Sequence, residues 1–168
     1  MRQEKMVAVV IATVTALLVA TVGTAMASAP TTADGTLTQT AVTGFELRIA
    51  GTNVVIEQTT RGVMSGTLSG TIEDTVTVVI HSDGTFEAHG TTICACSVHD
   101  KQGHVEFAVT DTGKQTSPDT SRFTGRAAIT RTTGELSGLA GHLDIEGTVD
   151  LTTGLSTIGY SGQIHLHP

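Results

Sequence analysis

Apolar and polar side chains alternate with a period of two along most of this chain, and the longer period of an amphipathic helix is absent. The clearest stretch places Leu143, Ile145, Val149 and Leu151 between acidic residues, glycine and threonine. Such strands have one apolar and one polar face, as in an antiparallel sheet with one solvated side. We therefore expect an all-β domain. Earlier strands are expected near 36–41, 44–50, 53–60 and 64–72.

Turn chemistry sets the register of one hairpin. A two-residue Asp83-Gly84 loop would place apolar Ile80 opposite polar Glu87, whereas a three-residue loop, with Gly84 in the left-handed region, pairs Ile80 with Phe86. The second arrangement keeps apolar side chains on one face. Because a slip of one residue would turn the strand inside out, we expect the three-residue loop.

Two further hairpins give matching faces. One is expected to pair Val98 with Val105, and the last to pair Val149 with Ile158. Three successive hairpins describe a meander, and a meander of many twisted strands closes on itself and so removes its exposed edges. The sequence predicts a single antiparallel up-and-down β-barrel of eight, or eight to nine, strands.

The N-terminus has the layout of a secretory signal. Arg2 and Lys5 precede an uncharged apolar stretch at 6–22, and Ala25-Met26-Ala27 places small residues where a signal peptidase cleaves. The alternative is an uncleaved membrane anchor, for which the stretch is short. We expect cleavage after Ala27 and a secreted, extracytoplasmic protein without a stable membrane span.

Three segments follow from this layout. Residues 1–27 form the signal peptide, 28–35 a flexible lead-in of small and polar residues, and 36–168 the barrel domain.

Composition narrows the range of partners. The chain carries a formal net charge of −7, with charged residues at 15% and aromatic residues at 3%. It has no block of lysine or arginine, and it offers few rings on which bases could stack, so we expect no nucleic-acid partner. A homo-oligomer remains open.

Glycine-rich motifs carry a family resemblance. Gly134-Glu135-Leu136-Ser137-Gly138-Leu139-Ala140-Gly141 precedes the last strands, and Tyr160-Ser161-Gly162-Gln163-Ile164-His165 closes the chain, while 65–71 and 81–85 fit the same pattern. Over 36–168 the chain resembles bacterial (actinobacterial-type) barrel proteins of unknown function that are grouped with plant allene oxide cyclase. The resemblance implies an eight-stranded antiparallel barrel with a central cavity.

The alternation also assigns side chains to the barrel interior. An eight-stranded barrel is either filled by its side chains or holds one small ligand, and both alternatives stay open. A hollow of about 300 Å³ or more would favour a ligand. The candidate lining residues are Phe45, Phe86, Cys94, Cys96, Phe107, Ile145 and Tyr160.

Cys94 and Cys96 are the most unusual pair among these residues. Alternate α-carbons of a regular strand lie about 6.6–6.8 Å apart, at the upper limit for a disulfide, so a bond between them needs a local bulge. Buried free thiols are the other main interpretation, and a metal or catalytic role is a third. The motif alone does not decide between them.

Signals for catalysis are weak. No nucleophile elbow, zinc-binding helix motif or phosphate loop occurs, and no cofactor or metal is expected. His99 and His104, near Glu106, give a further hypothesis, a metal site at the surface. The alternation assigns no carboxylate to the interior, and the neighbours of Glu57 do not fix which way it faces.

Two functions follow. The first is a non-enzymatic exported barrel that binds a small apolar molecule or serves as a structural surface module. The alternative is an isomerase-type cyclase that folds a polyene or polyketide inside the barrel, because confinement needs shape more than acid–base groups.

Overall fold

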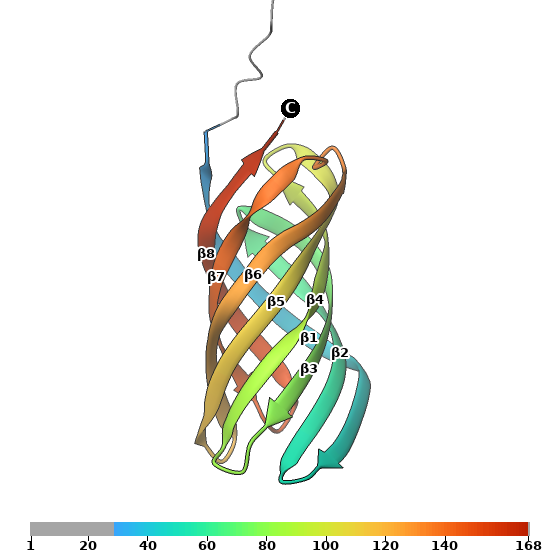
Figure 1. The fold of residues 1–168 in the computed structure, drawn as a ribbon. Coiled ribbons are helices and arrows are strands. Elements are labelled where there is room, and N and C mark those ends of the chain that lie inside the picture. Colours follow the sequence, from blue (N-terminus) through green and yellow to red (C-terminus); the bar gives the residue numbers. More distant parts are fainter. Residues whose placement is uncertain (1–28, 168) are drawn as a thin grey trace, which may run out of the picture.

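The computed structural model describes residues 29–167, which form a closed antiparallel barrel without helices (Figure 1). Neighbouring strands pair in chain order, and β1 closes the ring by pairing with β8. This confirms the predicted fold class. The strands are β1 (Thr31–Ala50), β2 (Asn53–Gly66), β3 (Leu68–Ile80), β4 (Thr85–Val98), β5 (Lys101–Ser117), β6 (Thr120–Gly134), β7 (Leu139–Asp150) and β8 (Leu155–Leu166).

The three-residue loop after β3 is confirmed. Ile80 pairs with Phe86, and the Gly84 N–H donates a hydrogen bond to the His81 carbonyl over 3.0 Å. Gly84 has φ 80°, a left-handed conformation that glycine adopts without a steric penalty.

The registers predicted for two other hairpins were wrong, although their faces were right. Val98 pairs with Lys101 and not with Val105, because His99 takes φ 54° and makes a tighter turn. Val149 pairs with Ser156 and not with Ile158. Both errors are even numbers of residues, so every side chain keeps its predicted side of the sheet.

The predicted lead-in at 28–35 was also wrong from Thr31 onwards. Thr31 pairs with Ile164 of β8, and the Ala33 side chain is fully buried, because closing the barrel requires a partner strand for β8. The two strands expected near 36–41 and 44–50 are a single strand, interrupted by two register shifts. The signal peptide expected at 1–27 lies outside the described residues.

Packing divides the barrel into two halves. The main hydrophobic core fills the upper half in Figure 1, the end where the described chain begins and ends. Leu136, in the turn between β6 and β7, is 1% exposed and belongs to this core. Buried side chains of the lower half, such as Phe86 and Phe123, lie outside this cluster.

Aromatic rings fit over glycines of the next strand. A Cβ atom at Gly113 would overlap the Phe86 ring, and one at Gly147 would overlap the Phe123 ring. The Tyr160 ring occupies the corresponding space beside Gly35. The absence of a glycine side chain therefore makes room for a large inward ring in a narrow barrel.

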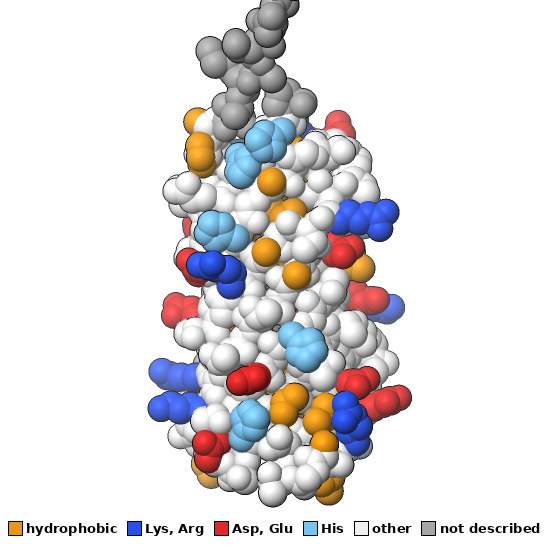
Figure 2. Space-filling model, in the orientation of Figure 1, with side chains coloured by type: hydrophobic (Ala, Val, Ile, Leu, Met, Phe, Trp, Pro, Cys, Tyr) orange, Lys and Arg blue, Asp and Glu red, His pale blue; other side chains and the backbone are white. Residues whose placement is uncertain are grey.

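The outer face is polar. Figure 2 shows basic, acidic and histidine side chains interspersed with smaller groups of apolar side chains over a mostly uncharged surface. Within 29–167, no helix has the length and apolar character to cross a membrane.

Candidate functional site

Polar side chains interrupt the interior near the middle of five neighbouring strands. They point inward between apolar layers, and all but the last are buried to within 8% exposure. We call them the polar belt: Gln39 of β1, Thr60 of β2, Asp74 of β3, Thr92 of β4 and Asp111 of β5.

Asp74 is held by its neighbours in the belt. Thr92 Oγ1 donates a hydrogen bond to Asp74 Oδ1 over 2.7 Å, and Gln39 Nε2 donates one to Asp74 Oδ2 over 2.9 Å. Gln39 Oε1 in turn accepts the Ser156 N–H of β8 over 2.9 Å, which fixes the amide orientation. Burial raises the pKa of Asp74, and the two hydrogen bonds offset part of the rise.

Asp111 is in a different situation. Its Oδ1 is buried without a hydrogen-bond partner among the described residues, as is Thr60 Oγ1. The carboxyl lies over Gly125, where a Cβ atom would overlap Oδ1. Burial raises the pKa of Asp111 to about 7, and the neighbouring charge of Asp74 adds to the rise. A carboxyl with this pKa can both donate and accept a proton near neutral pH.

A small hollow adjoins the belt. Its volume is about 50 Å³, room for a few waters but well below the roughly 300 Å³ of a typical ligand pocket. Most of the interior is therefore filled. The hollow is lined by Leu37, Met64, Asp74, Val76, Thr92, Phe107, Val109, Asp111, Ala127, Leu143, Ile145, Ile158 and Tyr160.

The structure brings three of the predicted lining residues together at this hollow. Phe107, Ile145 and Tyr160 line it. Phe86 is buried lower in the barrel, against Gly113 of β5.

Phe45 was placed wrongly in the interior. Its side chain is 57% exposed. It pairs with Gln58 and so shares the inward face of β2, but β1 pairs with β8 only as far as Thr38, so this part of β1 extends beyond the closed wall. The sequence therefore predicted the correct face for Phe45, but it did not predict that this part of β1 continues past its pairing with β8.

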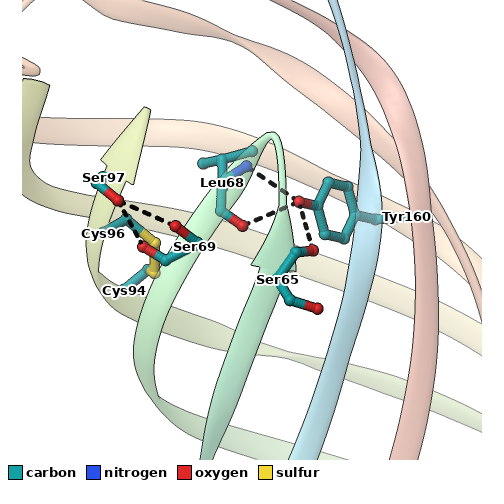
Figure 3. The surroundings of a disulfide bond; sticks show 7 residues. All are labelled: Ser65, Leu68, Ser69, Cys94, Cys96, Ser97 and Tyr160. Atoms are coloured by element: carbon teal, nitrogen blue, oxygen red, sulfur yellow. Dashed lines mark hydrogen bonds between the residues drawn. A yellow bond between two sulfur atoms is a disulfide. The ribbon is translucent and has the colours of Figure 1, made fainter. Parts of the chain in front are cut away.

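Tyr160 connects β8 to the turn between β2 and β3. Its hydroxyl accepts the Leu68 N–H over 3.1 Å and lies 3.1 Å from the carbonyl oxygens of Ser65 and Leu68, either of which can accept its proton (Figure 3). The ring also lines the hollow. Tyr160 therefore fixes the upper end of the barrel and contacts the candidate site.

Cys94 and Cys96 form a disulfide within β4 (Figure 3). Their α-carbons lie 5.2 Å apart, closer than in a regular strand. The expected bulge is absent, because β4 pairs with β3 and β5 without a register shift over these residues, so the strand contracts locally instead. They are 0% and 3% exposed and belong to the main hydrophobic core, but they do not line the hollow.

Sequence reasoning missed both carboxylates of the belt. Asp74 has the same parity as Ile72 and Val76, and Asp111 has that of Phe107 and Val109, so extending the alternation by one step would have placed both inside.

Glu57, whose direction the sequence left open, faces outward. Its Oε1 lies 3.8 Å from Arg48 Nη2, with both side chains more than half exposed. It therefore plays no part in the interior site.

The metal hypothesis finds no cluster to support it. His104 pairs with Ala95, while His99 occupies the turn. Among residues 29–167, no three His, Cys, Asp or Glu side chains gather around a point where a metal could bind.

A larger depression lies on the outer wall of β4 to β8. It measures about 960 Å³, but it is open, and outward polar side chains of both charges, such as Lys114 and Glu146, make up most of its lining. The interior belt is the stronger candidate, because there polar groups converge in an apolar, enclosed setting.

Comparisons with known proteins agree with the barrel. Neither a protein-family model nor a curated protein matches the chain. The solved structure of the pterocarpan synthase dirigent protein PsPTS1 is similar, with a TM-score of 0.51 and 14% identity over 84% of this chain and 98% of that one. At this identity the likeness shows the fold alone, and membership of a bacterial family related to allene oxide cyclase stays a prediction.

Proposed function

We propose that this barrel binds a small, mainly apolar molecule in its interior and that Asp111 binds the molecule's polar group. The observation that carries this proposal is the buried Oδ1 of Asp111, which has no hydrogen-bond partner in the described part of the chain and lies beside a mainly apolar hollow. Buried polar atoms are nearly always hydrogen-bonded, so an exception needs an explanation, and a ligand hydroxyl would supply one.

The two carboxylates of the belt have different roles in this proposal. Gln39 and Thr92 already occupy both oxygens of Asp74, which therefore orients the belt and keeps its charge close to Asp111. Asp111 has a free oxygen and a pKa of about 7, so it can accept a hydrogen bond from a ligand or donate one.

The size of the hollow sets a condition on binding. A ligand larger than about 50 Å³ requires side chains to move, and those of the lower half are outside the main core. Phe86 and Phe123 are the large rings there. We expect binding to select conformations in which these rings have shifted. The apparent affinity is then lower than the affinity of the shifted conformation by the fraction of the protein that adopts it.

Two features support an exported role. The N-terminal 27 residues have the layout of a signal peptide, and a disulfide is favoured in an oxidising compartment. The structural neighbour is described as a pterocarpan synthase dirigent protein, which is compatible with a barrel that holds a small organic molecule.

Ring closure by an isomerase-type cyclase is the second candidate. The observation that favours it is the pKa of Asp111, because a carboxyl that titrates near neutral pH can transfer a proton to or from a confined substrate.

Tyrosine fluorescence tests the binding proposal directly. The chain has one tyrosine and no tryptophan, and Tyr160 lines the hollow, so its emission reports on this site. The probes are matched pairs of cyclic monoterpene alcohols and their parent hydrocarbons. We expect saturable changes with the alcohols and about tenfold weaker binding of the hydrocarbons, which lack the hydroxyl.

Variants identify the group responsible. Asp111→Leu should remove the preference for alcohols, whereas Asp100→Asn, in the exposed turn after β4, should keep it. Emission that no probe changes, or an alcohol preference that survives in Asp111→Leu, would rule the proposal out.

A further inference from the structure

The lower end of the barrel exposes an apolar surface. Phe45, Leu47 and Ile49 of β1 are 57%, 55% and 77% exposed, and their pairing with β2 places all three on one face. In Figure 1 the hairpin of β1 and β2 stands away from β4 to β8 at this end. Three large apolar side chains on one exposed face suggest a surface that is covered in the functional state.

The same segment has an unpaired edge. β1 pairs with β8 only from Thr31 to Thr38, so from residue 41 to Ala50 its partner among the described strands is β2 alone. The pairing with β2 is regular from Gly44 to Ala50, and the segment contains no proline. Proteins usually protect such edges with proline, bulges or charged side chains. Here both register shifts lie before Gly44, and the charges of the segment, Glu46 and Arg48, lie on the face opposite Phe45, so the edge from Gly44 to Ala50 can pair with another strand.

The sequence of this edge is complementary to itself. When two copies run antiparallel about Leu47, Phe45 faces Ile49 of the other copy, and Glu46 faces Arg48. The apolar side chains of both copies then form one continuous patch. The opposite face gains two equivalent ion pairs, each between Glu46 of one copy and Arg48 of the other. A two-fold contact needs this kind of self-complementarity.

We propose that a second copy of this chain pairs with the free edge of β1 over residues 44–50, joining two barrels through a continuous antiparallel sheet. This surface is separate from the interior belt. The contact of Arg48 with Glu57 is a loose 3.8 Å pair at the surface, so it leaves the guanidinium free to meet Glu46 of the second copy.

Sedimentation equilibrium from about 1 to about 100 µM tests the proposal, because a two-fold contact makes the mean mass depend on concentration. We expect a dimer for the unaltered chain. Glu46→Arg should weaken dimerisation at least about tenfold, because it places like charges opposite each other. Glu87→Arg, an outward acidic position on β4, is the matched control and should leave the dimer intact.

Charge reversal separates pairing from misfolding. The double variant E46R/R48E should restore the dimer, and an equimolar mixture of E46R and R48E should form heterodimers, while circular dichroism shows the same β structure throughout. The proposal is overturned if the protein is a monomer at every concentration. A monomer that binds phosphatidylcholine vesicles in a separate assay would also overturn it, because a lipid surface would then cover the apolar face. It is also overturned by a dimer that E46R leaves unchanged.

Discussion

Asp74 and Asp111 lie in the same barrel interior, but their surroundings leave them with different hydrogen-bonding capacity. Asp74 accepts hydrogen bonds from Gln39 and Thr92, whereas Asp111 has a buried oxygen that finds no partner within residues 29–167. Leaving a buried polar group unpaired costs about 1–3 kcal/mol, so Asp111 weakens the fold that contains it. A ligand that supplies the missing hydrogen bond would recover this cost on binding.

Stability should depend on pH through Asp111. Because its pKa is raised to about 7 in the folded state from an ordinary value near 3.8, the folded protein binds the proton more tightly than the unfolded chain. Protonation of Asp111 therefore stabilises the folded state fully below pH 4, and this stabilisation is lost as the pH rises through 7. We expect the free energy of unfolding to fall by on the order of 3 kcal/mol between pH 5 and pH 7.5, measured by urea denaturation.

Asp111→Asn isolates this contribution, because the amide keeps the shape of the side chain and does not titrate. The fall across the same pH range should be largely abolished in this variant and should persist in Asp100→Asn. If the unaltered protein and Asp111→Asn show parallel pH profiles, the carboxyl is ionised in the folded state and the assignment is wrong.

Removing one oxygen from Tyr160 should loosen the upper end. In Tyr160→Phe the ring still fills its place beside Gly35, but the Leu68 N–H and the Ser65 carbonyl lose the hydroxyl. We expect a loss of about 1–3 kcal/mol in the free energy of unfolding, followed by circular dichroism in urea. An unchanged midpoint would show that these backbone groups find other partners.

Among the strands, the pattern of alternation predicts faces far better than registers. The period of two states which side of the sheet a residue faces, and shifting a partner by two or four residues leaves that answer unchanged. The Asp83-Gly84 turn signal predicted the register of one hairpin correctly. The next hairpin turns at His99 with φ 54°, a conformation that non-glycine residues seldom adopt, so no turn signal indicated its register. The extent of β1 beyond β8, which exposes Phe45, depends on non-local pairing and has no local signal.

The fit of rings over glycines is testable strand by strand. Gly113→Ala places a Cβ atom against the Phe86 ring and the Arg122 carbonyl, so we expect a loss of about 2 kcal/mol or more in the free energy of unfolding. Gly159→Ala on β8 meets only ordinary contacts near 3.8 Å and should be neutral or slightly stabilising. Equal effects of the two changes, in urea denaturation, would contradict the packing described for Phe86.

For the molecule as a whole, the sequence predicts a closed antiparallel barrel but not what lies inside it. Closure follows from successive hairpins with matching faces, which are local features. The volume of the hollow depends on the sum of many side chains and on the tilt of eight strands, so Phe107 and Tyr160 could be placed inside without showing that only about 50 Å³ remains. The sequence analysis missed Asp74 and Asp111, although their parity alone could have placed both inside, whereas their raised pKa depends on three-dimensional surroundings that the sequence does not show.

The central claim is that a carboxyl inside this barrel titrates near neutral pH and is free to meet a ligand. Carbon-13 NMR of the aspartate carboxyl groups, followed from pH 3 to pH 9, measures this directly. The account predicts one aspartate that titrates near pH 7 and whose signal is missing in Asp111→Asn. Carboxyl signals for Asp111 that complete their titration below about pH 5, as for a solvated aspartate, would contradict it.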